Sequence, residues 1–105
     1  MSAPGAAVVA DDPAGERYTA TVDGRLAGIA AYMLRPGLIA FVHTEVDPEY
    51  AGRGVGGTLI RGALDDARAR GLAVLPFCPF VDAYIKGHHE YLDLVPEDRR
   101  EHFGL

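Results

Sequence analysis

Residues 38–77 decide the fold; they read LIAFVHTEV, DPEYAGRG, VGGTLIRGALDDARAR and GLAVLPF. Residues 38–46 begin apolar on both faces, which is typical of a strand inside a sheet. Apolar residues at three- and four-residue spacing then predict an amphipathic helix over residues 55–70. Residues 73–77 are a short apolar run that predicts a second strand. Because strand–helix–strand crossovers are right-handed, we expect the two strands to lie parallel and adjacent.

The residues before this stretch predict antiparallel strands. Residues 6–10 form a weak strand that ends at the turn Asp12-Pro13-Ala14-Gly15. Residues 17–22 alternate polar and apolar side chains, and residues 25–34 form the returning strand. Asp23-Gly24 between them is a strong hairpin signal, because both turn positions favour positive φ. We therefore predict an α/β fold, in which an antiparallel meander and one parallel crossover form a mixed sheet with helices packed on it.

The residues after the crossover predict a second helix and a tail. Pro79 suits the first turn of a helix that ends near Gly87. Residues 96–105 are charged and are expected to pack weakly, so the domain should span residues 8–95. The long helix carries two oppositely charged pairs one turn apart, expected as surface ion pairs: Arg61 with Asp65, and Asp66 with Arg70.

The charge balance and the cysteine count exclude several classes of protein. Ten Lys and Arg against fifteen Asp and Glu give the 105 residues a net charge of −5. Without a basic run, such a chain is poorly suited to nucleic acid or to an anionic membrane. Cys78 is the single cysteine, which excludes an internal disulfide framework and a Cys-cluster zinc site. No apolar stretch is long enough to span a bilayer. We expect a cytoplasmic protein that is a monomer or a weak dimer.

A glycine-rich loop, Gly52-Arg53-Gly54-Val55-Gly56-Gly57-Thr58, lies between the first strand of the crossover and its helix. Glycines let the backbone approach a ligand and leave the first helix amides free, which makes an anion site. Arg53 adds a charged contact. The alternative is a flexible turn, but glycines weaken a helix start, and this loss favours a binding role. A P-loop would need Lys where Gly57 stands, and the dinucleotide fingerprint lacks its strand spacing and acidic residue.

The segment 46–56, followed by an amphipathic helix, resembles the acetyl-CoA signature Gln/Arg-x-x-Gly-x-Gly/Ala of the GNAT N-acetyltransferases. The match falls on Arg53, Gly54, Val55, Gly56 and Gly57, whereas Ala51 replaces the first Gln or Arg, so that one side-chain contact is lost. Three further segments resemble a small, cysteine-containing (CG-type) GNAT subfamily: His43-Thr44-Glu45-Val46-Asp47-Pro48, Cys78-Pro79-Phe80-Val81 with Tyr84, and His88-His89-Glu90-Tyr91. The resemblance covers about residues 8–95; it departs at His89, where proline is expected.

The resemblance implies acetyl-CoA as cosubstrate and assigns its contacts. The loop amides, from Arg53 to Thr58, would cradle the CoA pyrophosphate, and the Val46 amide would contact the acyl carbonyl. Cys78 and Tyr84 would lie near the thioester. Tyr84 would protonate the departing CoA thiolate, although a core tyrosine is the alternative.

Three polar side chains are candidates for the transfer itself. Cys78 directly precedes the second helix, whose N-terminus stabilises a thiolate, and the resemblance implies an acetyl-cysteine; the alternative is a small buried apolar residue. His43 and Glu45 are two residues apart on one strand, so they share a face and lie about 7 Å apart. Either accepts a proton from an attacking amine, Glu45 being the stronger candidate, unless both belong to a solvated strand end. His88-His89-Glu90 lacks a third metal ligand at useful spacing, so no metal site is predicted.

These features predict an acetyl-CoA-dependent transfer to a primary amine, either a small amine or a protein lysine or N-terminus. The amine attacks acetyl-CoA directly or attacks an acetyl-Cys78. The alternative is a non-catalytic module that binds CoA or acyl-CoA and regulates a partner. Most GNAT domains place two helices between their first two strands, whereas residues 10–17 here form only a turn. The acceptor side should therefore be open, which suits an amine on a macromolecule or a site completed by a second chain.

Overall fold

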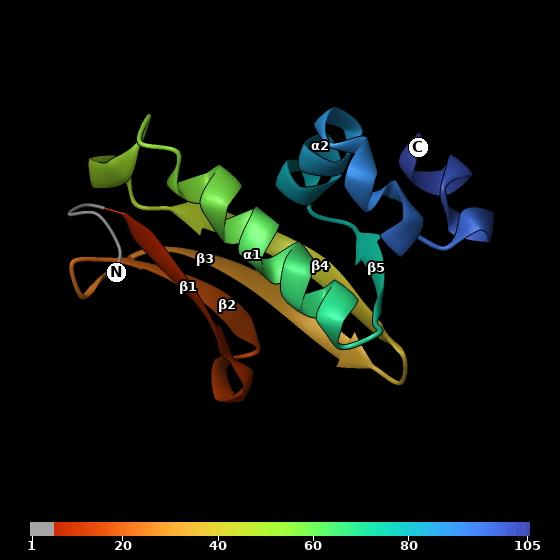
Figure 1. The fold of residues 1–105 in the computed structure, drawn as a ribbon, viewed down its shortest axis with the longest axis horizontal. Coiled ribbons are helices and arrows are strands. Elements are labelled where there is room, and N and C mark those ends of the chain that lie inside the picture. Colours follow the sequence, from red (N-terminus) through yellow and green to blue (C-terminus); the bar gives the residue numbers. More distant parts are fainter. Residues whose placement is uncertain (1–5) are drawn as a thin grey trace.

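The computed structural model describes residues 6–105, which build one mixed sheet with helices on it (Figure 1). The sheet has five strands in the order β1-β2-β3-β4-β5, namely β1 (Ala7–Asp12), β2 (Arg17–Val22), β3 (Arg25–Arg35), β4 (Leu38–Val46) and β5 (Ala73–Pro76). The helices are α1 (Val55–Ala69) and α2 (Pro79–Gly87), and the 3-10 helices are η1 (Pro13–Gly15), η2 (Pro48–Tyr50), η3 (His89–Leu94), η4 (Glu97–Arg99) and η5 (Glu101–Phe103). β1 to β4 are antiparallel and β4 pairs with β5 in parallel, so the predicted architecture is confirmed.

The turns between the first strands are as tight as the sequence predicts. Asp23 and Gly24 have φ values of 51° and 80°, so both central positions of the β2–β3 hairpin have positive φ, as a type I′ turn requires. Only η1 connects β1 to β2, and Asp12 caps it by accepting a hydrogen bond from the Gly15 amide at 3.3 Å. In the part of the chain that the structure describes, no α-helix separates the first two strands, as predicted.

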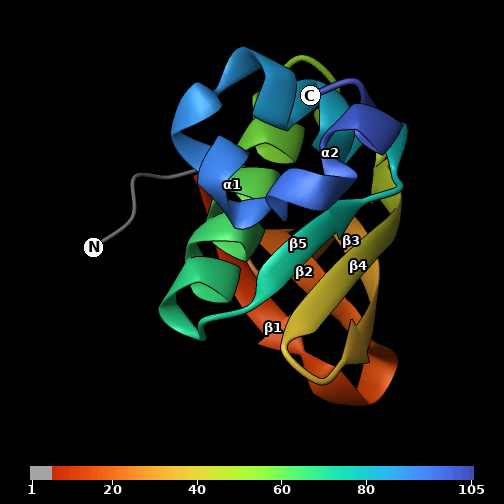
Figure 2. The same ribbon diagram turned by 90° about the vertical axis from the view of Figure 1, so that its right-hand side faces the viewer.

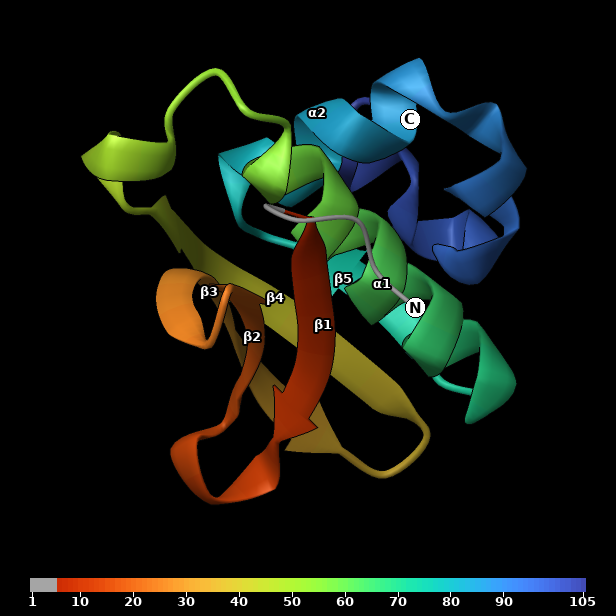
Figure 3. The ribbon, with the colours of Figure 1, turned by 60° about the vertical axis from the view of Figure 1, so that its left-hand side comes forward.

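The core lies between α1 and one face of the sheet. The whole predicted apolar stripe of α1 is buried, and so is Gly56; the stripe consists of Val55, Leu59, Ile60, Ala63, Leu64 and Ala67. On the sheet, the rings of Tyr18, Tyr32 and Phe41 form a cluster with centroids 5.4 to 6.5 Å apart. Burial of this apolar surface stabilises the layer by roughly 25 cal/mol per Å². Figures 2 and 3 show α1 and α2 on the same side of the sheet, with α1 beside β1.

A β-bulge in β4 changes which of its side chains face the helices. Phe41 pairs with Tyr32 and His43 pairs with Ala31, so Val42 is the extra residue. Before the bulge, Phe41 points into the core; beyond it, the alternation shifts by one residue. Thr44 therefore lies on the helix side of the sheet, and His43 lies on the opposite side.

The parallel pair separates after a few residues. β4 and β5 are paired only from Leu38 with Ala73 to Phe41 with Pro76. β4 then continues to Val46, whereas the chain after β5 turns into α2. The two strands therefore splay, and the edge of β4 beyond Phe41 has no neighbouring strand on that side within the described residues.

The C-terminal residues 96–105, expected to pack weakly, contain no fully buried residue. Phe103 and Leu105 are partly buried against the core. The Phe103 ring meets Phe77 edge to face at 5.2 Å, and the Arg100 guanidinium donates to the Val95 carbonyl at 3.0 Å. No helix among residues 6–105 is long and apolar enough to cross a membrane.

One of the two predicted ion pairs on α1 does not form. Asp66 and Arg70 lie 3.4 Å apart, as expected. Asp65, however, accepts a hydrogen bond from the Tyr91 hydroxyl at 2.7 Å. Arg61 is left without a hydrogen bond or ion pair to any residue that the structure describes.

Candidate active site

The glycine loop forms the mouth of a helix. Gly52 and Gly54 have φ values of 76° and 75°, a conformation that favours glycine. Gly54 is the N-cap of α1, and its carbonyl accepts the first hydrogen bond of the helix, from the Thr58 amide at 3.1 Å. The amides of Val55, Gly56 and Gly57 come before that bond. Among residues 6–105, none of these three donates to a main-chain carbonyl.

The mouth has the electrostatics of an anion site. The unpaired amides and the helix dipole place partial positive charge there. Within the described chain, no acidic residue lies in the first turn of α1 and no side chain caps it. A hollow of about 300 Å³ opens onto these residues and is also lined by Val46, Tyr50 and Phe80. The Arg53 guanidinium lies 5.1 Å from the centre of the Tyr50 ring, so a cation–π contact holds it beside the hollow.

Phe80 brings a second helix N-terminus to the same place. A Cβ atom on Gly56 would lie 2.6 Å from Cζ of Phe80, so the ring packs directly on the glycine backbone. Phe80 is the second residue of α2, and Cys78 is the N-cap of that helix. The first turns of α1 and α2 therefore meet beside one hollow. Phe80 was not predicted as a site residue, although it lies only two residues after Cys78.

Cys78 lies at the splay between β4 and β5. Its amide donates to the Phe41 carbonyl at 2.8 Å, which fixes the start of α2 against β4. Its side chain is 3% exposed, and Sγ lies 3.2 Å from Oγ1 of Thr44. The thiol is thus buried and hydrogen-bonded, at the position that the sequence predicts. Thr44 is a contact that sequence reasoning missed, because only the bulge turns it toward the helices.

The Val46 amide lies on the same side of β4 as the splay. The next amide, that of Asp47, donates to the Ala27 carbonyl at 2.8 Å, across the β3 edge. Successive main-chain groups of a strand alternate between its edges, so the Val46 N–H points toward the side where β5 has turned away. It is therefore available to an acceptor in the splay.

His43 and Glu45 share the other face of the sheet. His43 Nε2 lies 3.3 Å from Glu45 Oε1, and both side chains are exposed. A hollow of about 610 Å³ at the ends of β3 and β4 is lined by Ile29, Glu45 and Asp47, and also by Thr44 and Val46. The two candidate bases thus lie together, but across β4 from Cys78.

Tyr84 is directed toward the start of α1. Its Cε2 atom lies 3.9 Å from the Cβ position of Gly57. Its ring stacks on His88, with the centroids 3.9 Å apart and the planes at 10°. The structure thus places Tyr84 beside the glycine loop. No hydrogen bond joins it to Cys78 among the described residues.

The comparisons with known proteins identify the family. A model described as GCN5-related N-acetyl-transferase matches residues 17–94, so the chain belongs to the GCN5-related N-acetyltransferase family. This confirms the family that the loop and the three accompanying segments predict. No curated protein shows significant sequence similarity to the chain.

Two solved structures share the fold. The solution structure of a GCN5-like protein from Staphylococcus aureus, described as a candidate N-acetyltransferase, is 20% identical, with a TM-score of 0.65 over 85% of this chain and 87% of that one. The ribosomal-protein-S18-alanine N-acetyltransferase from Escherichia coli is 21% identical, with a TM-score of 0.59. That match covers 68% of this chain and 49% of the E. coli protein. At these identities the likeness supports the GNAT-like fold of the chain.

Proposed function

We propose that the protein is an acetyl-CoA-dependent N-acetyltransferase that acts on a primary amine. The observation that carries this proposal is the path from the amide mouth of α1, past Phe80, to the splay at Cys78. When the CoA diphosphate lies at the free amides of Val55, Gly56 and Gly57, the pantetheine arm of CoA is directed into that splay. The Val46 amide then donates a hydrogen bond to the acetyl carbonyl oxygen, on which negative charge develops during transfer.

The acceptor amine enters from the opposite face of the sheet. An ammonium must lose a proton before its nitrogen attacks the acetyl carbon, and Glu45 is the base, assisted by His43. The hollow beside Glu45 lies at the ends of β3 and β4, and no residue of α1 or α2 lines it. Such a site suits an amine that projects from a larger molecule, such as a protein lysine or N-terminus, as well as a small amine.

Two routes for the acetyl group follow from the position of Cys78. In direct transfer, the amine nitrogen bonds to the acetyl carbon, the carbon–sulfur bond of acetyl-CoA breaks, and the CoA sulfur leaves with a proton from water, because Tyr84 lies at the glycine loop. In the covalent route, the Cys78 sulfur first replaces the CoA sulfur on the acetyl carbon, and its proton passes to the departing CoA. The amine then displaces Cys78, which regains a proton.

CoA release from acetyl-CoA with a panel of amines and lysine peptides tests the proposal. We expect Glu45→Gln to lower kcat/KM by about 10²-fold, within the range for loss of a general base. Glu49→Gln is the matched control, since Glu49 is an exposed carboxylate at the same end of the sheet that pairs with Arg25 at 3.5 Å. CoA binding without transfer to any amine would instead identify a CoA-binding regulatory module.

Intact-mass measurement distinguishes the two routes. The wild-type protein is mixed with acetyl-CoA in the absence of an amine, and Cys78→Ala is treated in the same way. A mass increase of one acetyl group that Cys78→Ala lacks supports the covalent route. An unchanged mass, with acetyl transfer retained in Cys78→Ala, supports direct attack.

A further inference from the structure

A second hollow lies beside the glycine loop and has no part in the transfer described above. It measures about 350 Å³ and is lined by Arg61, Tyr84, His88, Glu90 and Tyr91. Tyr84 contacts the Gly57 position at 3.9 Å, so this hollow begins where the amide mouth ends. Arg61 is one helical turn beyond Gly57, a rise of about 6 Å along α1. A ligand held at the mouth by a diphosphate therefore reaches this hollow with its other end.

Arg61 supplies a free cation to the hollow. The carboxylate expected to pair with it, Asp65, is occupied by the Tyr91 hydroxyl at 2.7 Å. The next arginine on this side of α1, Arg68, binds Asp93 through two hydrogen bonds of 2.8 and 3.0 Å. Among residues 6–105, Arg61 alone of these groups has no polar partner. An unpaired guanidinium beside a diphosphate site is suited to a second phosphate group, which it binds through parallel N–H donors.

The aromatic and acidic groups of the hollow define the rest of the ligand. The Tyr84 and His88 rings are stacked at 3.9 Å. His88 Nδ1 lies 2.8 Å from the Tyr84 carbonyl, and because a carbonyl only accepts, Nδ1 carries the hydrogen and the ring is held in place. A fixed, exposed ring offers a surface on which a base can stack. The Glu90 carboxylate is a hydrogen-bond acceptor, and the amino group of adenine is a donor that fits it.

We propose that this hollow binds the adenosine 3′-phosphate end of CoA and that Arg61 makes the protein select CoA over 3′-dephospho-CoA. The inference rests on the proposed use of acetyl-CoA. It goes further by assigning a specificity-determining residue outside the glycine loop. Arg61 contacts the phosphate and takes no part in the acetyl transfer.

Calorimetric titration with CoA and with 3′-dephospho-CoA tests this assignment in wild type and in Arg61→Gln. Arg99→Gln is the matched control, because Arg99 lies in η4, outside this hollow, and its loss changes the net charge equally. We expect wild type and Arg99→Gln to bind CoA roughly five- to tenfold more tightly than 3′-dephospho-CoA, as for one charge-assisted contact. In Arg61→Gln the ratio should fall to about one, with the Kd of 3′-dephospho-CoA unchanged. Added salt should reduce the ratio in wild type but not in Arg61→Gln.

The other outcomes overturn the assignment in distinguishable ways. A wild-type ratio of one, or a ratio that Arg61→Gln retains, contradicts the role of Arg61 and leaves the proposed function intact. Equal weakening of both ligands in Arg61→Gln indicates a structural effect and also contradicts it. Failure of wild type to bind either ligand removes both the inference and the proposed function. Equal thermal unfolding midpoints for the two variants show that both are folded.

Discussion

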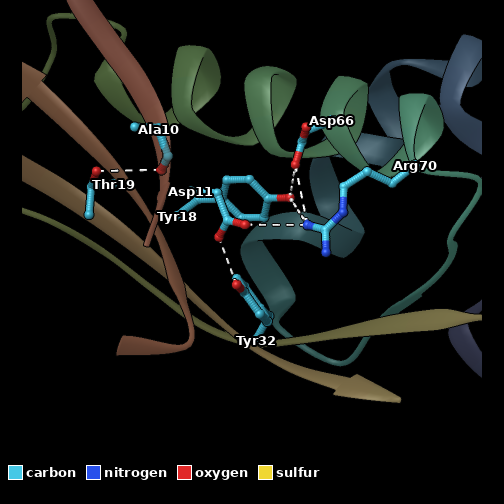
Figure 4. Close-up of polar contacts among 7 residues, drawn as sticks. All are labelled: Ala10, Asp11, Tyr18, Thr19, Tyr32, Asp66 and Arg70. Atoms are coloured by element: carbon cyan, nitrogen blue, oxygen red, sulfur yellow. Dashed lines mark hydrogen bonds and ion pairs between the residues drawn. The ribbon is translucent and has the colours of Figure 1, made fainter. Parts of the chain in front are cut away.

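The two ends of α1 are built in opposite ways. The N-terminal end is rich in glycine and has no capping side chain. There the amides of Val55, Gly56 and Gly57 have no main-chain acceptor in the described chain. At the other end, Figure 4 shows polar side chains paired with one another. Asp66 accepts from the Tyr18 hydroxyl, and Arg70 donates to Asp11 at 3.3 Å.

This difference between the two ends of α1 separates a region that stabilises the fold from a region whose amides are free to bind a ligand. The paired end joins α1 to β1, β2 and β3, because Asp11 also accepts from the Tyr32 hydroxyl at 2.7 Å. Burial and these hydrogen bonds raise the pKa of Tyr18 above its ordinary value and that of Tyr32 from 10.0 to about 12. The open end contributes less to folding, since glycine is disfavoured in helices and its amides lack partners. Substitutions at the two ends should therefore separate stability from CoA binding.

The largest expected effect is on stability, at the paired end. Asp66→Ala leaves the hydroxyl of the buried Tyr18 without its acceptor, which costs about 1–3 kcal/mol. Urea unfolding measures this loss. Tyr18→Phe combined with Asp66→Ala should lose less than the sum of the two single variants, because no orphaned hydroxyl remains. CoA affinity should stay within about twofold of wild type for a site at the other end of the helix, and a larger loss would contradict the separation of the two ends.

The next largest effect is on binding, at the open end. Gly54→Ala forces an alanine into a conformation with φ of 75°, and Gly37→Ala does the same at 74° in the β3–β4 turn. Neither new Cβ would meet another atom within 4 Å, so the two variants are matched in strain. Each should lose about 1 kcal/mol of unfolding free energy. Only Gly54→Ala should weaken CoA binding, by about tenfold or more for a displaced amide cradle. Equal affinity of the two variants would show that the mouth does not hold the ligand.

A smaller effect distinguishes two adjacent glycines. Gly57→Ala should raise stability by about 0.5–1 kcal/mol, since alanine is the better helix former. Its Cβ would lie 3.9 Å from Tyr84, an ordinary contact, whereas a Cβ on Gly56 would lie 2.6 Å from Phe80. Gly56→Ala should therefore not raise the unfolding free energy of wild type. Added to Phe80→Ala, which removes the ring, it should raise the unfolding free energy above that of Phe80→Ala alone. A full gain from Gly56→Ala alone would contradict the packing of Phe80 on the mouth.

The smallest effect is a change in the pH dependence of stability. Burial and the hydrogen bond to Asp65 raise the pKa of Tyr91 from 10.0 to about 12. A raised pKa in the folded state gives stability that is complete below pH 10 and is lost as the pH rises to about 12. Urea unfolding across this interval should show a shallower loss in Tyr91→Phe than in wild type. Identical slopes would show that the Tyr91 hydroxyl has the same pKa in the folded and unfolded chains.

Sequence patterns predicted the fold more completely than the side-chain geometry of the site. Periodicity and turn chemistry located β2, β4, α1, α2 and the Asp23-Gly24 hairpin, because these depend on neighbouring residues. The partner of Asp65 was predicted wrongly, because Asp65 accepts from the Tyr91 hydroxyl and does not pair with Arg61. The edge-to-face contact between Phe77 and Phe103 was not predicted. Both depend on residues distant in the sequence, whose contacts form only when the tertiary structure does.

The arrangement around Cys78 illustrates the same limit. Strand alternation alone places His43 on the same face as Phe41, toward the core. The extra residue at Val42 reverses this assignment, so that Thr44 reaches the thiol and His43 faces outward. A one-residue bulge has no clear signal in a single sequence, yet it decides which side chains of β4 face Cys78 and which face outward.

NMR titration of the amide resonances with CoA tests the central claim most directly. The amides of Val55, Gly56 and Gly57 should shift progressively and saturate together, because these amides make up the proposed diphosphate site. Amides at the paired end of α1, such as those of Asp66 and Arg70, should stay in place. Saturable CoA binding that leaves the three mouth amides unshifted would contradict the account.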